Sequence, residues 1–345
     1  MTADARVPGP PPQAVAVQLA RVCQASRALH SAVRLGVPDC LGAGARTFEE
    51  IAQLTGTHPD RMRRLLRVLA AVDIVRDLGA GKFELTAVGD CLRADAPGSV
   101  RSIVLLTANS WPEMEHLDDC IRTGKNAFEL RHGVAPFAYL AQHPERAAVF
   151  NEAMREFSES TGAALLQAYD FTTVGRVIDV GGGHGTVLAS ILNAHAHLRG
   201  VLLDRPDVAA GAPALLARAG VADRCEVVPG DMLASVPAGG DVYLLSHIVH
   251  DWLDEPARRI LQACRAAMAP QARLLIVDRL MPERVEPGPV AENDLLYDLT
   301  MMVMMGGRER TAAELKTLLG SAGLRLERIA LLPSTPDKLV EASPA

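Results

Sequence analysis

The sequence predicts an α/β protein in which an α-helical N-terminal region precedes a doubly wound parallel sheet. From about Phe171 to Asp278, short apolar runs alternate with helical patterns. The runs are apolar throughout, as strands covered on both faces should be, and the first leads directly into a glycine-rich turn. From Pro12 to about Asp95 the apolar spacing is helical and is interrupted by short polar turns. Two domains of different class therefore follow one another along the chain.

The composition is that of a globular protein with one large and one smaller domain. The chain has 345 residues, 49% of them hydrophobic and 22% charged. With 35 Lys and Arg against 41 Asp and Glu it is mildly acidic, so we expect no nucleic-acid partner. It shows neither the layout of a signal peptide nor an apolar run of membrane-spanning length, so we expect a cytoplasmic protein with no membrane partner. The six cysteines have no C-x-x-C or zinc-finger spacing and predict reduced structural thiols and no metal.

After an expected flexible tail over residues 1–11, residues 12–96 read as a winged helix. Thr47 and Glu50 form a capping-box pattern, Pro59 opens the next helix, and residues 76–92 predict a small β-wing. A winged helix serves DNA-binding regulators, but it also serves as a dimerisation and pocket-covering domain. The few basic residues of its second helix, in an acidic chain, favour the second interpretation. Residues 97–166 predict a helical connector that contributes to the substrate pocket, and residues 167–345 predict the catalytic domain.

The stretch from Val177 to Thr186, VIDVGGGHGT, predicts a strand, a glycine turn and a helix that together hold a cofactor. Glycines permit positive φ and let backbone N–H groups approach a ligand closely. A dinucleotide turn needs G-x-G-x-x-G, but Thr186 or Leu188 occupies the third glycine position. The acidic Asp179 followed by G-x-G-x-G instead resembles motif I of the class I methyltransferases, which use S-adenosylmethionine.

Acidic residues also follow the next two predicted strands. Asp204 ends the second strand, where a carboxylate can accept hydrogen bonds from both ribose hydroxyls of a nucleoside cofactor; a dinucleotide enzyme places an acid similarly. The third strand ends at Gly230, Asp231 and Met232, a sequence similar to the methyltransferase position in which the acid lies beside the adenine amine. Asp231 also fits a helix N-cap.

The fourth strand, DVYLLSHIVHDW, is expected to end with His250-Asp251-Trp252 at the carboxyl edge of the sheet. Together with VFNEAM, DVGGGHG and GGRERT, this resembles the small-molecule O-methyltransferases. Those enzymes act on plant phenylpropanoids such as caffeate, on flavonoids, and on bacterial polyketide, phenazine and hydroxyneurosporene hydroxyls. The resemblance covers nearly the whole chain. It implies a Rossmann-like sheet, S-adenosylmethionine as cofactor with S-adenosylhomocysteine as product, a homodimer whose N-terminal helices complete the partner's pocket, and no metal.

The resemblance also implies a mechanism. His250 matches the base that takes the proton of the acceptor hydroxyl, which is useful because a phenol with a pKa near ~10 is mostly protonated at neutral pH. Asp278 and Glu309 match the carboxylates that orient the imidazole and favour its charged form. Asp278 stands where plant members often have Glu, so its contact with His250 is the weaker expectation.

The remaining site residues are implied by the same resemblance. Those expected at the cofactor are Ser158, Asp179, Gly181, Gly183, Asp204, Arg205, Gly230, Asp231, Met232, Ser246, Asp251 and Trp252. Those expected at the acceptor are Phe150, Met154, His247, Met301, Met304 and Met305. Each has a structural alternative: a methionine run, here Met301, Met302, Met304 and Met305, is often core, Asp251 fits a cap, and His247 fits simple packing inside the strand.

The predicted function is therefore methyl transfer to an aromatic or enolic hydroxyl of a small specialised metabolite. Three alternatives stay open. The fold could carry a related hydroxylase, decarboxylase or cyclase, although such members often lose the histidine. The acceptor atom could be nitrogen, because a base near the acceptor does not name the atom. A winged-helix regulator is the third, and binding to heparin or DNA at low salt distinguishes it.

Overall fold

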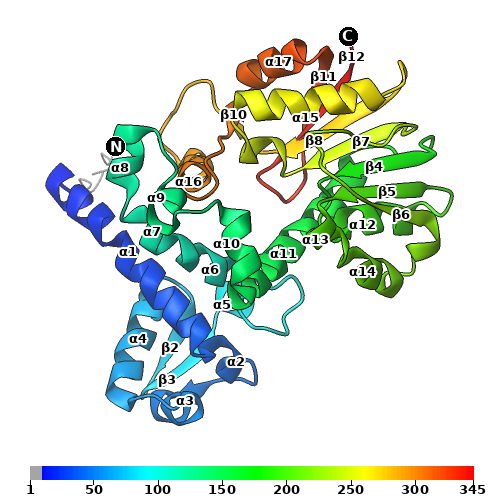
Figure 1. Cartoon of the computed structure of the whole chain (residues 1–345). Coiled ribbons are helices and arrows are strands. Elements are labelled where there is room, and N and C mark those ends of the chain that lie inside the picture. The colour runs from blue at the N-terminus through cyan, green and yellow to red at the C-terminus, as the bar shows by residue number, and fades with distance from the viewer. Residues whose placement is uncertain (1–9) are drawn as a thin grey trace, which may run out of the picture. The chain divides into compact units, whose positions relative to one another are not determined.

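The computed structural model describes residues 10–345, apart from the side chains of residues 289–292, and the chain forms two compact units. The first ends at Asn109 and the second runs from Ser110 to Ala345 (Figure 1). Most of the tail expected over residues 1–11 lies outside the described residues. The domain boundaries expected after residues 96 and 166 stay predictions. Among residues 10–345, no helix is both long and apolar enough to cross a membrane.

The first unit is a helical domain with a small antiparallel sheet. Its elements are α1 (Pro12–Arg34), α2 (Val37–Leu41), β1 (Arg46–Thr47), α3 (Phe48–Thr55), α4 (Pro59–Ala71), β2 (Val75–Gly79), β3 (Lys82–Leu85), α5 (Ala87–Asp90) and α6 (Arg101–Thr107). The strands pair in the order β1-β3-β2. Buried Ile51, Met62, Leu66 and Phe83 form its core with neighbouring apolar residues.

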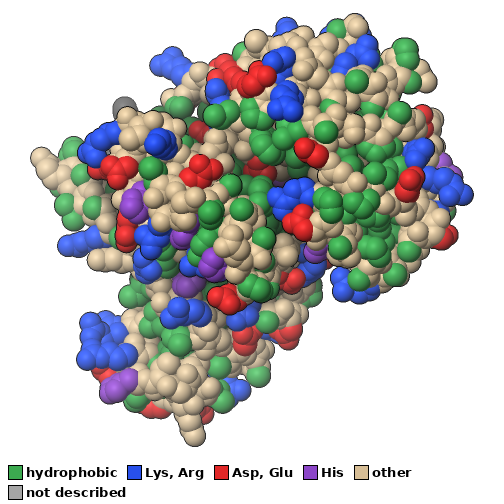
Figure 2. Space-filling view, viewed as in Figure 1, with side chains coloured by type: hydrophobic (Ala, Val, Ile, Leu, Met, Phe, Trp, Pro, Cys, Tyr) green, Lys and Arg blue, Asp and Glu red, His purple; other side chains and the backbone are tan. Residues whose placement is uncertain are grey.

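Local signals in the sequence set the ends of these helices. The capping box at Thr47 is formed, with the Glu50 N–H donating to the Thr47 hydroxyl and the Thr47 N–H donating to the Glu50 carboxylate. Pro59 is the first residue of α4, as expected, and the predicted wing is the β2–β3 hairpin. The side of α4 away from the core carries exposed arginines, visible as a basic cluster over that helix in Figure 2.

Helices alone form the first part of the second unit. A 3-10 turn, η1 (Ala108–Ser110), precedes α7 (Trp111–Met114), α8 (Leu117–Thr123), α9 (Ala127–His132), α10 (Pro136–Gln142) and the long α11 (Pro144–Ala168). Prolines open α10 and α11 near their first residues, where a missing N–H costs nothing. Rings of α9 and α10 stack on one another, with Tyr139 and His143 nearly parallel at 3.7 Å between centroids.

The rest of the second unit is the α/β domain. Its elements are β4 (Arg176–Val180), α12 (Thr186–Ala194), β5 (Arg199–Asp204), α13 (Pro206–Ala209), α14 (Ala212–Arg218), η2 (Ala222–Arg224), β6 (Cys225–Pro229), β7 (Val242–Ser246), η3 (Val249–Asp251), α15 (Asp254–Ala267), β8 (Arg273–Asp278), β9 (Leu280–Met281), α16 (Pro289–Met304), β10 (Arg310–Thr311), α17 (Ala312–Ser321), β11 (Leu324–Leu331) and β12 (Lys338–Pro344).

Seven strands form one sheet in the order β11-β12-β8-β7-β4-β5-β6. Strands β4 to β8 are parallel, and the chain order reverses between β4 and β7. One face packs on α15 and α17, and the other packs on α12, α14 and the end of α11 (Figure 1). The doubly wound sheet is thus confirmed. In such sheets ligands bind at the carboxyl ends of the strands beside the reversal, here β4 and β7.

Three sequence expectations need correction. Strand β7 ends at Ser246, so His250 lies in η3 and His247 follows the strand instead of lying inside it, because His247 has φ +55° and interrupts the extended backbone. The helix expected over residues 208–220 is two helices, since Pro213 cannot continue a helix. The sheet is not wholly parallel, because β12 inserts antiparallel to β8 and β11 pairs antiparallel with it.

Candidate active site

The glycine turn after β4 forms a ligand cradle. Gly181, Gly183 and Gly185 have φ of +74°, +62° and +88°, a conformation that side-chain-bearing residues rarely adopt. The Gly183 N–H donates to Asp204 Oδ2 at 2.8 Å, which ties the turn to the end of β5. Any Cβ at Gly182 would lie 2.3 Å from Asp179 Oδ2, so this backbone must approach the carboxylate closely.

Carboxylates line the carboxyl edge of three neighbouring strands. Asp179 is buried and neither of its oxygens has a hydrogen-bond partner among the described residues. Burial, together with the charge of Asp204, raises the pKa of Asp179 to about 7, and burial also raises the pKa of Asp204. Asp231, after β6, is exposed and accepts a hydrogen bond from the Leu233 N–H. A buried carboxylate without a donor is costly, and a cationic ligand that donates hydrogen bonds would offset that cost.

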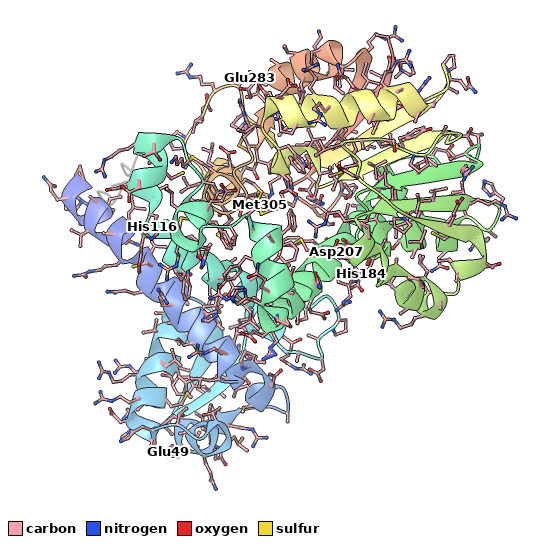
Figure 3. The ribbon with its side chains drawn as sticks, viewed as in Figure 1. Glu49, His116, His184, Asp207, Glu283 and Met305 are labelled. Carbon is pink, nitrogen blue, oxygen red and sulfur yellow. The ribbon has the colours of Figure 1, made fainter. Side chains whose placement is uncertain are left out.

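The other residues expected at the cofactor lie around this cradle or beside it. Gly230 follows β6, and its N–H donates to the Asp204 carbonyl. Met232 Sδ lies 3.4 Å from the position of a Cβ at Gly181. Arg205 is exposed, pairs with Asp207 and lies over the Phe137 ring at 5.0 Å. Figure 3 marks His184 and Asp207 near the starts of the helices that follow β4 and β5. Ser158 lies half-buried in α11, Ser246 ends β7, and Trp252 follows η3.

A buried histidine and three acids form the centre of the site. His250 Nδ1 donates to Glu309 Oε1 at 2.7 Å, and His250 is 4% exposed. Asp278 Oδ1 lies 3.8 Å from the same nitrogen, beyond hydrogen-bond distance. On the opposite side of the ring, Asp251 Oδ1 lies 3.6 Å from Nε2. Nε2 is therefore the ring nitrogen left available to another group.

Charges around His250 change its acid–base behaviour. Burial alone would lower the pKa of the imidazole, but the charge of Asp278 and the hydrogen bond to Glu309 outweigh burial. The charge of Asp251 acts in the same direction, and the pKa of His250 rises to about 10. Burial, opposed by the charge of His250, holds the pKa of Asp278 well above its usual range. The site thus stabilises an imidazolium strongly.

Backbone and side-chain contacts hold this centre in place. Gly307 packs so closely that a Cβ there would lie 2.0 Å from the His250 carbonyl oxygen. The Glu309 N–H donates to Asp298 Oδ1 in α16 at 2.8 Å. The Arg310 guanidinium donates to the Val249 and Trp252 carbonyls at the two ends of η3, at 3.0 and 2.8 Å.

The residues expected at the acceptor are spread over α11, α16 and the turn after β7. Phe150 packs edge-on to Phe137, and Met154 lies half-buried on the same helix. In α16, Met301 is 8% exposed, while Met302 and Met304 pack on a small core with Cys120, Ala127 and Val303. Met305, labelled in Figure 3, follows α16. The structural alternative therefore has support for Met304, and the acceptor roles stay predictions.

Sequence reasoning missed several polar residues around the centre. Asp298, Arg279, Asp294, Tyr297 and Asp337 all belong to the same region. Arg279 lies 3.9 Å from the centroid of the Tyr297 ring, whose own centroid is 6.0 Å from that of His250. GGRERT, already quoted for Glu309, could have drawn attention to Arg310. No spacing signal relates Asp337 to His250.

The reversal between β4 and β7, the glycine cradle and the carboxylates at successive strand ends define a Rossmann-like methyltransferase domain. Residues 114–325 match the O-methyltransferase domain model, and residues 17–95 match the O-methyltransferase dimerisation domain. The chain therefore belongs to the S-adenosylmethionine-dependent O-methyltransferase family, whose dimerisation domain implies a homodimer.

Relatives and solved structures agree with this assignment. The chain is 39% identical to the mitomycin biosynthesis 6-O-methyltransferase of Streptomyces lavendulae, over 92% of this chain and 90% of that one. It is 39% identical to the 8-amino-8-demethylriboflavin N,N-dimethyltransferase of Streptomyces davaonensis, over 86% and 85%. The crystal structure of LaPhzM superposes with a TM-score of 0.88 at 37% identity, covering 97% and 100%. NcsB1, solved with S-adenosylmethionine and 2-hydroxy-5-methyl naphthoic acid, gives a TM-score of 0.78 at 32% identity, covering 93% and 96%.

Proposed function

We propose that this enzyme methylates an aromatic or enolic hydroxyl of a small specialised metabolite and that His250 is its general base. The observation that carries the proposal is the buried hydrogen bond between His250 Nδ1 and Glu309, which leaves Nε2 to receive a proton. When bound, S-adenosylmethionine supplies an electrophilic methyl group on a positively charged sulfur. The orphaned Asp179 carboxylate and the glycine cradle support the cofactor's binding at the ends of β4 and β5.

The raised pKa of His250 suits the removal of a phenolic proton. Transfer from a phenol of pKa ~10 to an imidazole of pKa ~6.5 is unfavourable by about 5 kcal/mol. With the pKa of His250 at about 10 the transfer is nearly balanced, which is the condition for efficient proton transfer. The same pKa means that the imidazole must first lose a proton, so turnover should rise with pH.

The three acids around the ring have different parts in this proposal. Glu309 fixes the tautomer with the proton on Nδ1 and stabilises the imidazolium formed at Nε2. Asp278, at 3.8 Å, contributes charge without a hydrogen bond. Asp251 lies on the Nε2 side, where it would favour positive charge next to the reacting hydroxyl. None of these groups needs to move for the proton to transfer.

An aromatic acceptor is supported by the relatives. NcsB1 binds a naphthoic acid, and other members of the family carry names for mitomycin and phenazine substrates. Half-buried Phe150 and Met154 offer the kind of surface that planar rings contact well. We also propose that residues 97–166 contribute to this pocket and that the N-terminal helices of the homodimer complete the pocket of the partner subunit.

The test is the variant His250→Ala, assayed for methyl transfer to a panel of phenols and hydroxylated naphthalenes. We expect kcat to fall by roughly 10²–10⁴-fold, with the Kd for S-adenosylmethionine unchanged within a few-fold. His58→Ala is the control, because His58 is exposed and its side chain makes no capping hydrogen bond to α4. Near-normal turnover of the His250 variant would remove this residue from the mechanism.

Nitrogen is the second candidate acceptor atom, because one 39% identical relative is an N,N-dimethyltransferase. An aromatic amine can attack through its lone pair before it loses a proton, so it depends less on a base. Acceptors that differ only in bearing a hydroxyl or an amino group separate the two cases. If the amine is the better substrate of the native enzyme and His250→Ala leaves its turnover intact, N-methylation is the function.

A further inference from the structure

The turn that carries His250 begins with a residue in an unfavourable backbone conformation. His247 has φ +55°, and its N–H donates to the Val277 carbonyl at 2.8 Å. The chain then passes directly into η3, which contains His250. A non-glycine residue in the left-handed region persists only where surrounding contacts hold it. The contacts of the His247 side chain are therefore part of what places His250.

Both ring nitrogens of His247 have partners. Nε2 donates to Asp337 Oδ2 at 3.1 Å, and Nδ1 lies 3.3 Å from the Ser246 hydroxyl. Because a hydroxyl can donate or accept, this arrangement suits either charge state of the ring. The His247 side chain is 22% exposed, whereas that of His250 is 4% exposed.

Asp337 reaches His247 through the antiparallel strand β12. Lys338 pairs with Asp278 in the register of β12 and β8, so the residue before it lies at the edge of the sheet where the catalytic acids are. Asp337 is 6% exposed, and the Arg279 guanidinium lies 3.9 Å away. Although burial opposes it, the hydrogen bond from His247 and the nearby positive charges lower the pKa of Asp337.

We propose that His247, held by Asp337, is a positioning residue that acts through His250: it fixes the turn that carries the base and places a second imidazolium beside it, which makes His250 easier to deprotonate. The two imidazole centroids are 5.7 Å apart. The inference rests on the proposed role of His250 as the base. It differs from the acceptor contact that the family resemblance implies for His247.

The charges around the pair give this arrangement a purpose. Three acids favour the protonated form of His250: Asp251 in η3, Asp278 in β8 and Glu309 before β10. With these acids alone, the base would hold its proton over most of the working pH range. The other groups that face the pair are Tyr297 and Asp294 of α16, with Arg279 after β8. Arg279 is already held between Asp294 and Asp337, so within the described residues His247 is the cation whose ring is next to His250.

Asparagine at position 247 separates the electrostatic effect from the backbone effect. Asn tolerates φ near +55° better than most residues, so His247→Asn preserves the turn. The substitution removes a positive charge and leaves the charge of Asp337 uncompensated, and both changes make His250 harder to deprotonate. In the double variant His247→Asn/Asp337→Asn one positive and one negative group are lost, so the net charge beside His250 is restored.

The first experiment is an NMR titration of the histidine Cε1–H resonances of the intact dimer from pH 6 to pH 11, without acceptor. The His250 signal is assigned by its loss in His250→Ala. We expect His247→Asn to raise the pKa of His250 by at least about half a pH unit, and the double variant to return it close to the native value. A pKa unchanged or lowered in His247→Asn would overturn the proposal, as would a double variant that stays at the single-variant value.

The second experiment measures kcat and KM against pH for the same variants. The acidic limb of kcat should move to higher pH in His247→Asn, with KM for the acceptor unchanged, and should move back in the double variant. A raised KM with an unmoved limb would mean that His247 contacts the acceptor, and would refute the inference. If His250→Ala proves fully active, the base role fails, but the titration still reads the coupling between the two histidines.

Discussion

Glu309→Gln tests how the structure creates a strong base. The Glu309 side chain is completely buried and accepts from His250 Nδ1 at 2.7 Å. Glutamine has the same shape and keeps an acceptor oxygen, so the hydrogen bond and the tautomer can survive while the negative charge is lost. The pKa of His250, now about 10, should therefore fall.

The size of the change follows from the hydrogen bond. Hydrogen bonds to charged groups contribute about 1.5–3 kcal/mol, and about 1.4 kcal/mol corresponds to one pKa unit, so the pKa of His250 should fall by about one to two pH units. A histidine whose folded pKa falls loses its proton at lower pH, so the acidic limb of kcat moves downward. Above that limb, where the native base is fully deprotonated, the weaker base should give kcat about 10–100-fold below the native value.

The assay is methyl transfer followed by chromatography at intervals from pH 6 to pH 10.5, with saturating cofactor. The deficit of Glu309→Gln should be small near pH 7 and largest at alkaline pH, because deprotonation compensates for weaker basicity only below the limb. Glu314→Gln is the matched control, since Glu314 caps α17 and pairs with Arg308 near the same loop without facing His250. A limb that does not move, with a plateau within twofold of the native enzyme, would refute the reasoning.

Other consequences are open to measurement. Asp179→Asn should stabilise the cofactor-free protein more at pH 8 than at pH 5: the folded pKa of about 7 lies above the ordinary 3.8, so ionisation costs nothing below 3.8 and its full cost applies above 7; equal changes in Tm at both pH values would contradict this. Gly307→Ala should cost more than about 2 kcal/mol and reduce kcat, since its Cβ would lie 2.0 Å from a backbone oxygen, whereas Gly320→Ala in α17 meets open space and should be neutral or stabilising by denaturant unfolding. Light scattering should show a dimer at micromolar concentration that Leu19→Glu weakens, because Leu19 is 64% exposed on α1; a native monomer would be the contrary result.

Much of the cofactor region was predictable because its signals are local. A glycine turn must follow its strand directly, and the residues after β5 and β6 are adjacent in sequence to strands that apolar runs identify. Asp179 and Asp204 could thus be located before the structure was known, as could the capping box at Thr47. The structure agrees with the weaker expectation for Asp278, whose shorter side chain stays at 3.8 Å from His250 where Glu309 reaches 2.7 Å.

The sequence by itself determined the family, the parallel sheet and the identity of the base with its main acid, because each depends on a short motif or a strand end. Only the tertiary structure decided that His250 lies in a 3-10 turn after a left-handed residue, and that Arg310 holds that turn by its carbonyls. Tertiary structure alone also brought Asp337 to His247, 90 residues away along the chain. Contacts of this kind depend on how β12 inserts beside β8, and strand order is a property of the packed sheet that no local pattern encodes.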